Sequence, residues 1–284
     1  MVEIIFPGKI RKQYQFLKLT RLNVSGNLKN KRDKCLIFRQ EVTEMIECQN
    51  ISVTYNNGVQ ALKKINLRIK GPTIMGIIGP NGSGKSTLLK AILGMIQLTG
   101  EVSINGVSSK KMLKKVAYVA QKTLIDLSFP ITVKECVALG TISNVGLFKT
   151  IRKGEWKKVE EALEVVGLKE QQERQINALS GGQFQRVLIA RCLVQDAEYL
   201  FLDEPFVGVD MVSENIIVKI LKDLKESGKT ILIVHHDLSK VEDYFDQLVM
   251  LNNKMIAVGK TSDVFNTNNL KRTYGEKIFI DGGE

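Results

Sequence analysis

The order of apolar and polar residues along the chain changes period several times from about residue 45 onwards. Positions 46–53 and 65–69 alternate between apolar and polar side chains, which is the period of a strand with one buried face. The tripeptide Asn56-Asn57-Gly58 between them is a turn signal. This pattern predicts an antiparallel pair of strands.

Continuous apolar runs at residues 73–78, 199–202 and 230–234 are typical of strands that are buried on both faces. Apolar residues at helical spacing follow two of these runs, at 88–96 and 216–224. Further short strands are predicted at 101–104 and 116–119. Strands separated by helices require crossover connections, so we predict an α/β fold with a mostly parallel core sheet and an antiparallel β subdomain.

The strand pattern disappears between about residues 122 and 178. Thr132 and Glu135 have the spacing of a capping box, and apolar residues at 156–166 mark one face of a further helix. This stretch predicts a helical insertion of roughly 55 residues in the α/β core. We place the domain at 45–260, with a C-terminal tail at 261–284.

The segment after the strand at 73–78 matches the phosphate-loop pattern G-x-x-x-x-G-K-[ST] at every position. Glycines let backbone N–H groups turn towards phosphate oxygens, and a helix N-terminus adds positive potential. Lys85 would reach the β- and γ-phosphates, and the Ser86 hydroxyl would bind Mg²⁺. The alternative, a glycine-rich turn with a solvated lysine, fits the strand–loop–helix context poorly. The candidate nucleotide-binding residues here are Gly79, Pro80, Asn81, Gly82, Ser83, Gly84, Lys85, Ser86 and Thr87.

Asp203 and Glu204 follow the apolar run at 199–202. The carboxyl end of a parallel strand is the edge at which open α/β sheets bind ligands. Asp203 would hold Mg²⁺ through a water, and Glu204 would act as a general base on the attacking water. Such a pair alone is more often the solvated start of a loop, but the upstream phosphate loop favours the catalytic interpretation.

A third motif, Leu179-Ser180-Gly181-Gly182-Gln183, lies 23 residues before Asp203 at the start of an apolar-periodic helix. With the phosphate loop, it resembles the signature of the ATP-binding-cassette (ABC) ATPases, and the resemblance covers about residues 45–256. The resemblance implies that Ser180, Gly181, Gly182 and Gln183 contact the γ-phosphate of ATP bound to the opposite subunit. A plain capped helix entrance is the alternative.

The resemblance also implies roles for four further residues. Gln121 matches the glutamine that senses Mg²⁺ and the attacking water, and His236 matches the histidine that touches the γ-phosphate. Asp210 matches an aspartate at the dimer contact, and Tyr55 matches the aromatic residue that stacks on adenine. His235 occupies a position where the family often has a small hydroxyl residue.

The apolar stretches are far shorter than the roughly 20 residues that span a bilayer, so another polypeptide would supply any membrane span. The resemblance implies a pair of cassettes, expected to be a homodimer, on permease subunits at the cytoplasmic face of the membrane. Soluble DNA-repair or chromosome ATPases and translation-associated ATPases are the alternatives. Only 118 residues separate Lys85 from Asp203, with no heptad run between them, which favours a transporter.

Three segments resemble the cassettes of bacterial importers for manganese, zinc or ferrous iron. They are Asp126 to Glu135, Glu204 to Asp210, and His235 to Leu238 with the following Glu242 to Asp246. The resemblance implies a metal importer, with manganese favoured and an extracytoplasmic metal-binding protein as a further partner. A cassette for another small substrate, such as an iron chelate, is the alternative.

The positive charge of the chain is concentrated at its N-terminus. Residues 1–44 hold ten Lys or Arg and four Asp or Glu, a net +6, so the other 240 residues carry only +5 of the total of +11. The extension is interpreted as a translated upstream region, a flexible arm attracted to anionic lipid, or a targeting peptide. We expect it to be unstructured or absent from the native protein, and no nucleic-acid partner is needed to explain the charge.

Overall fold

The computed structural model describes residues 45–122, 125–146 and 150–276. All of them belong to one compact unit that runs from Glu44 to Glu284. The predicted N-terminal extension at 1–44 lies outside the described residues, as do the last eight residues of the predicted tail.

The core sheet has six strands in the order β10-β9-β3-β8-β7-β6. Five of them run parallel and β10 pairs antiparallel with β9 at one edge, which confirms the mostly parallel sheet. Every residue of β3, β7 and β8 is buried, as their unbroken apolar sequences predict. The strands are β3 (Thr73–Ile78), β6 (Val116–Val119), β7 (Tyr199–Asp203), β8 (Thr230–Val234), β9 (Gln247–Asn252) and β10 (Lys254–Lys260).

A second sheet of four antiparallel strands has the order β2-β1-β4-β5. Its strands are β1 (Met45–Thr54), β2 (Gln60–Lys70), β4 (Thr99–Ile104) and β5 (Val107–Ser108). The pairing of Cys48 with Leu67 and of Ile46 with Ile69 confirms the predicted antiparallel pair. The apolar residues of both strands face the buried side, because side chains alternate between the two faces of a strand.

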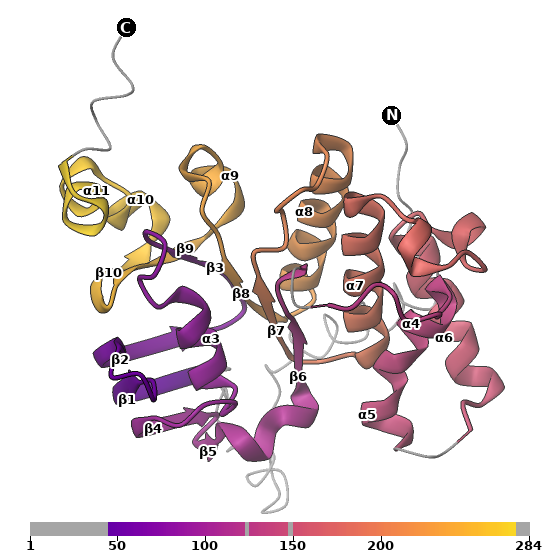
Figure 1. The fold of residues 1–284 in the computed structure, drawn as a ribbon, viewed down its shortest axis with the longest axis horizontal. Coiled ribbons are helices and arrows are strands. Elements are labelled where there is room, and N and C mark those ends of the chain that lie inside the picture. The colour runs from indigo at the N-terminus through magenta and orange to yellow at the C-terminus, as the bar shows by residue number, and fades with distance from the viewer. Residues whose placement is uncertain (1–44, 123–124, 147–149, 277–284) are drawn as a thin grey trace, which may run out of the picture. The chain divides into compact units, whose positions relative to one another are not determined.

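Helices connect the core strands and fill the stretch between β6 and β7. They are α3 (Lys85–Ile92), α4 (Val133–Ala138), α5 (Ile142–Val145), α6 (Lys153–Val165), α7 (Gly181–Gln195), α8 (Met211–Glu226), α9 (Val241–Tyr244), α10 (Thr261–Val264) and α11 (Thr267–Tyr274). Figure 1 shows α4 to α6 grouped beside α7, away from the antiparallel sheet. The predicted capping box of Thr132 and Glu135 is present at the start of α4. The limits of the helical insertion stay a prediction.

One apolar cluster joins the two sheets through α3. Leu88, Leu89 and Ile92 of α3 pack with residues of both sheets, and all three side chains are fully buried. Burying side chains of this size contributes about 1.5–3 kcal/mol each. The start of α3 is therefore held firmly at the carboxyl end of β3.

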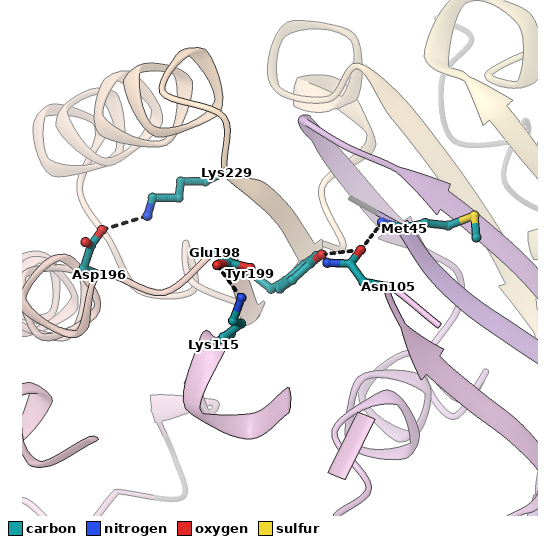
Figure 2. A network of polar contacts seen from close by, with 7 residues as sticks. All are labelled: Met45, Asn105, Lys115, Asp196, Glu198, Tyr199 and Lys229. Carbon is teal, nitrogen blue, oxygen red and sulfur yellow. Dashed lines mark hydrogen bonds and ion pairs between the residues drawn. The ribbon is translucent and has the colours of Figure 1, made fainter. Parts of the chain in front are cut away.

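A polar network also joins the two sheets (Figure 2). The hydroxyl of Tyr199, at the start of β7, donates a hydrogen bond of 3.1 Å to Asn105 Oδ1 in the turn between β4 and β5. The same oxygen accepts the backbone N–H of Met45 at 2.9 Å. The ion pairs of Lys115 with Glu198 and of Lys229 with Asp196 lie nearer the surface.

Among the residues that the structure describes, no helix is long and apolar enough to cross a bilayer.

We expect Tyr199→Phe to lower the free energy of unfolding by about 1 kcal/mol, because the substitution removes a buried hydroxyl from this network. Urea denaturation monitored by circular dichroism measures the change. Lys115→Ala is the matched control. It should lower the free energy of unfolding by less than about 0.5 kcal/mol, because the ion pair of Lys115 with Glu198 is exposed. An equal or larger loss in the control would contradict the role of the Tyr199–Asn105 contact.

Candidate functional site

The predicted phosphate loop connects β3 to α3 and packs closely against neighbouring backbone. A Cβ atom on Gly79 would overlap the carbonyl oxygen of Leu251, and one on Gly84 would lie 2.6 Å from the carbonyl oxygen of Ala61. Gly84 also has a φ of 96°, a left-handed conformation that glycine adopts without strain. The loop leads directly into the first turn of α3, where backbone N–H groups have no partner within the helix. This arrangement is suited to binding an anion.

Lys85 is the first residue of α3, and its side chain is turned into the loop. It is only 6% exposed, and its Nζ donates hydrogen bonds to the carbonyl oxygens of Gly79 at 2.8 Å and Pro80 at 3.0 Å. Burial lowers the pKa of Lys85, while the carboxylates of Glu204 and Asp203 act in the opposite direction. The ammonium group is therefore fixed between the phosphate loop and two acidic residues.

Asp203 is the last residue of β7 and the most deeply buried acidic side chain of the site, at 2% exposure. The hydroxyl of Ser86 donates a hydrogen bond to Asp203 Oδ1 at 2.8 Å. Burial raises the pKa of Asp203, and the hydrogen bond from Ser86 partly offsets that rise. The side-chain oxygens of Ser86 and Asp203, which are 117 residues apart in the sequence, thus lie side by side.

Glu204 turns away from the line of β7. Its φ of 53° is left-handed, which is uncommon for a residue with a side chain, and its N–H donates to the carbonyl of Val234 on β8. Gln121, two residues beyond the end of β6, donates from Nε2 to Glu204 Oε2 at 2.6 Å. The parallel neighbours β6 and β7 therefore bring this amide and this carboxylate together, beside Asp203.

The two neighbouring histidines lie in different surroundings. His235 is buried between the rings of Phe206 and Phe245, whose centroids lie 5.6 Å and 5.5 Å from its own. Burial, and then the charge of His236, lower the pKa of His235 to about 4. His236 is exposed. The packing of His235 is that of a structural residue, which leaves the predicted phosphate contact to His236.

The predicted signature forms the start of α7. Ser180 caps this helix by accepting the N–H of Gln183 at 3.2 Å, and the side chain of Gln183 accepts the N–H of Ser180 at 3.0 Å. A Cβ atom on Gly182 would overlap the carboxylate of Asp210. Asp210 in turn caps α8 through the N–H of Ser213 at 2.9 Å, which lowers the pKa of Asp210. The signature and the Asp210 loop thus form one packed unit.

Tyr55 follows the end of β1 and reaches the phosphate-loop helix. Its hydroxyl forms a hydrogen bond of 3.0 Å with the Thr87 hydroxyl, and 41% of the residue is exposed. An exposed ring held at one end is suited to stacking against a planar ligand. Its contact with adenine stays a prediction.

Apart from His236, which lies two residues after β8, the structure thus divides the predicted residues into two groups. The first group surrounds the start of α3 and comprises the phosphate loop with Tyr55, Ser86, Gln121, Asp203 and Glu204. The second group comprises Ser180 to Gln183 and Asp210. The sequence analysis missed Tyr118, whose hydroxyl is buried near Asp203 and whose pKa is raised to about 12, chiefly by burial. Its position three residues before Gln121 is the signal that could have indicated it.

We expect His235 to make the protein less stable as the pH falls from 6.5 to 4. The folded state keeps its imidazole neutral while the unfolded chain binds a proton, so protonation favours unfolding by at most about 1.4 kcal/mol per pH unit. Urea midpoints at pH 7.0 and 5.0 should differ less in His235→Asn than in the unsubstituted protein. An identical pH dependence in both proteins would contradict the neutral, buried state of His235.

The chain matches the ABC transporter family over residues 62–207. It is 47% identical over 230 residues to the manganese transport system ATP-binding protein MntB of Halalkalibacterium halodurans. The aligned residues cover 81% of this chain and 92% of that protein. It is 44% identical over 234 residues to the zinc transport system ATP-binding protein TroB of Treponema pallidum, covering 82% and 88%.

A solved structure has the same fold. The nucleotide-free ATP-binding cassette of an ABC transporter superposes with a TM-score of 0.70 at 26% identity, covering 85% of this chain and all of that chain. The parallel core sheet, the antiparallel sheet and the helices therefore form the architecture of such a cassette. The family match, the sequence identity to these relatives and the shared fold agree. This chain is an ATP-binding member of the ABC transporter family.

Proposed function

We propose that this chain is the ATP-hydrolysing subunit of an importer for divalent metal ions, with manganese as the favoured cargo. The proposed ATP hydrolysis is supported by one observation: two pairs of side chains meet beside the phosphate loop. Ser86 contacts Asp203 at 2.8 Å and Gln121 contacts Glu204 at 2.6 Å. The charges of both carboxylates act on the buried Lys85.

In this proposal the loop from Gly79 to Ser86 binds the phosphates of ATP through its backbone N–H groups and through Lys85. The exposed ring of Tyr55 stacks on adenine, held by its hydrogen bond to Thr87. When ATP binds, the Lys85 ammonium exchanges the carbonyl oxygens of Gly79 and Pro80 for phosphate oxygens. It can then stabilise the negative charge that develops during phosphoryl transfer.

Glu204 is proposed as the general base that orients and deprotonates the attacking water. Its left-handed backbone directs the carboxylate out of the sheet, and the amide of Gln121 holds one of its oxygens. The second carboxylate oxygen can then accept the proton of the water. The exposed His236 is proposed to contact the γ-phosphate from the carboxyl end of β8.

The residues around Asp203 also suit Mg²⁺, which accompanies ATP in this family. A buried carboxylate, the Ser86 hydroxyl and the Gln121 amide oxygen are hard oxygen donors of the kind that Mg²⁺ prefers. The raised pKa of Asp203 reflects a buried charge that a divalent cation would compensate. Bound Mg²⁺ would neutralise charge on the β- and γ-phosphates.

The second group of residues is proposed to act on a second copy of the chain. Ser180 and Gly182 lie at the N-terminus of the 15-residue helix α7, which offers N–H groups and positive potential to an anion. Two copies arranged head to tail would then close around two ATP molecules, with Asp210 at their contact. Subunits of this family drive transport by moving permease partners, so we place the dimer at the cytoplasmic face of the membrane. An extracytoplasmic metal-binding protein completes the proposed system.

The proposed cargo rests on the relatives. The protein at 47% identity is named for manganese transport, and the protein at 44% identity is named for zinc transport. Manganese therefore leads, and zinc is the second candidate.

We expect Glu204→Gln to reduce ATP hydrolysis by about 10²- to 10⁴-fold, because the substitution removes the proposed base and keeps its size. The variant should still bind ATP and should elute as a nucleotide-bound dimer in size-exclusion chromatography. Glu198→Gln is the control, since Glu198 lies at the opposite end of β7 in an exposed ion pair with Lys115. Hydrolysis that persists in the Glu204 variant would rule out the proposed base.

We expect a strain that lacks the chain to accumulate less ⁵⁴Mn²⁺ than its parent. The gene for the unsubstituted chain should restore accumulation and the Glu204→Gln gene should not, because transport depends on hydrolysis. Loss of ⁶⁵Zn²⁺ uptake alone would transfer the assignment to zinc. Unchanged accumulation of manganese, zinc and iron would contradict a metal importer.

A further inference from the structure

A phosphate-binding loop has a structural requirement that its own residues do not meet. Its N–H groups must point inward to the phosphates, so several carbonyl groups point outward and need hydrogen-bond donors. Two of these carbonyls, those of Gly82 and Ser83, accept hydrogen bonds from one residue about 170 positions later. The backbone N–H of Asn253 donates to Ser83 at 2.9 Å, and its side-chain Nδ2 lies 3.4 Å from the oxygen of Gly82.

Asn253 forms the turn between β9 and β10, and two further hydrogen bonds join it to β2. Its Nδ2 donates to the carbonyl of Ala61 on β2 at 3.1 Å, and its own carbonyl accepts the N–H of Lys63 at 2.8 Å. The φ of Asn253 is 55°, a left-handed conformation that asparagine adopts more readily than most residues. This one residue therefore ties the phosphate loop to the edge of the antiparallel sheet.

The hairpin that carries Asn253 has two further neighbours, α11 and the first glycine of the loop. Asn252, its neighbour, donates from Nδ2 to the carbonyl of Thr273 on α11 at 3.0 Å. The carbonyl of Leu251 fills the space where a side chain at Gly79 would lie. The hydroxyl of Tyr274, also on α11, is buried near the N–H of Gly79. The hairpin thus contacts the loop at its first glycine and again at Gly82 and Ser83, and its Asn252 side chain points to α11 instead.

We propose that Asn253 is a positioning residue for nucleotide binding, and that its side-chain amide, which joins the Gly82 carbonyl to Ala61 of β2, helps its backbone N–H to hold the Gly82–Ser83 segment in the phosphate-binding conformation. The proposal rests on ATP binding at the loop from Gly79 to Ser86. A loop that is already ordered binds ATP without the entropic cost of becoming ordered, so Asn253 acts on affinity. Glu204 and Gln121 follow other strands, β7 and β6, so the chemical step is expected to be little changed.

Asn253→Gly tests the amide separately from the backbone. Glycine keeps the left-handed φ and the N–H that reaches Ser83, and it removes only the side-chain donor. We expect its dissociation constant for ATP, measured by isothermal titration calorimetry on the full chain, to rise about ten-fold, the effect of losing one to two hydrogen bonds. The rate of hydrolysis at saturating ATP should stay within about two-fold of the unsubstituted value.

Asn252→Ala is the matched control because it removes the adjacent side-chain hydrogen bond, which faces α11. Its dissociation constant for ATP should stay within about two-fold of the unsubstituted value. The melting temperature of each protein without nucleotide measures global stability, and an affinity loss confined to the Asn253 variant cannot then follow from stability. Asn253→Ala, which also removes the donor and adds no charge, carries the same test if the glycine variant does not fold.

An unchanged affinity in Asn253→Gly would overturn the proposal, and so would an equal loss of affinity in Asn252→Ala. Either result would leave the proposed function intact, provided that the unsubstituted chain binds ATP in the same titration. Conversely, persistent hydrolysis in Glu204→Gln would remove the proposed base without affecting the inference about Asn253.

Discussion

Asp203 is an acidic side chain held almost entirely away from water, and the arrangement of the site follows from that constraint. An uncompensated buried carboxylate is costly, so it requires donors and positive charge nearby. The Ser86 hydroxyl supplies a hydrogen bond, and the buried Lys85 supplies charge from the same turn of α3. These partners can reach Asp203 because β3 and β7 are parallel and end at the same edge of the core sheet.

The backbone around this edge is under equally tight steric constraints. The carbonyl of Leu251 and that of Ala61 approach the phosphate loop so closely that only glycine fits at positions 79 and 84. Glu204 and Asn253 both adopt left-handed φ angles, one beside the carboxylate cluster and one behind the loop. The C-terminal hairpin therefore packs directly against the phosphate loop through Leu251 and Asn253, although it contributes no residue to the motifs of the family.

Most core strands could be predicted because burial leaves a period in the sequence. The apolar run at 73–78 becomes the central strand β3, and the alternating residues at 46–53 and 65–69 become β1 and β2 in the expected pairing. The β9–β10 hairpin and α11 were not predicted. The contacts of Asn253 join single residues far apart in the chain, and such contacts leave no periodic signal. The capping of α7 by Ser180 could have been recognised from Gln183, three residues later.

The sequence by itself determined most elements of the core and the motif of the phosphate loop, because both depend on local order. Apolar spacing selects strand or helix, and the glycines with Lys85 and Ser86 specify an anion site wherever they connect a strand to a helix. The tertiary structure decided which distant groups meet. It placed Gln121 against Glu204, buried His235 while exposing His236, and set Asn253 behind the loop. These outcomes depend on strand order and on packing between elements, which no local pattern encodes.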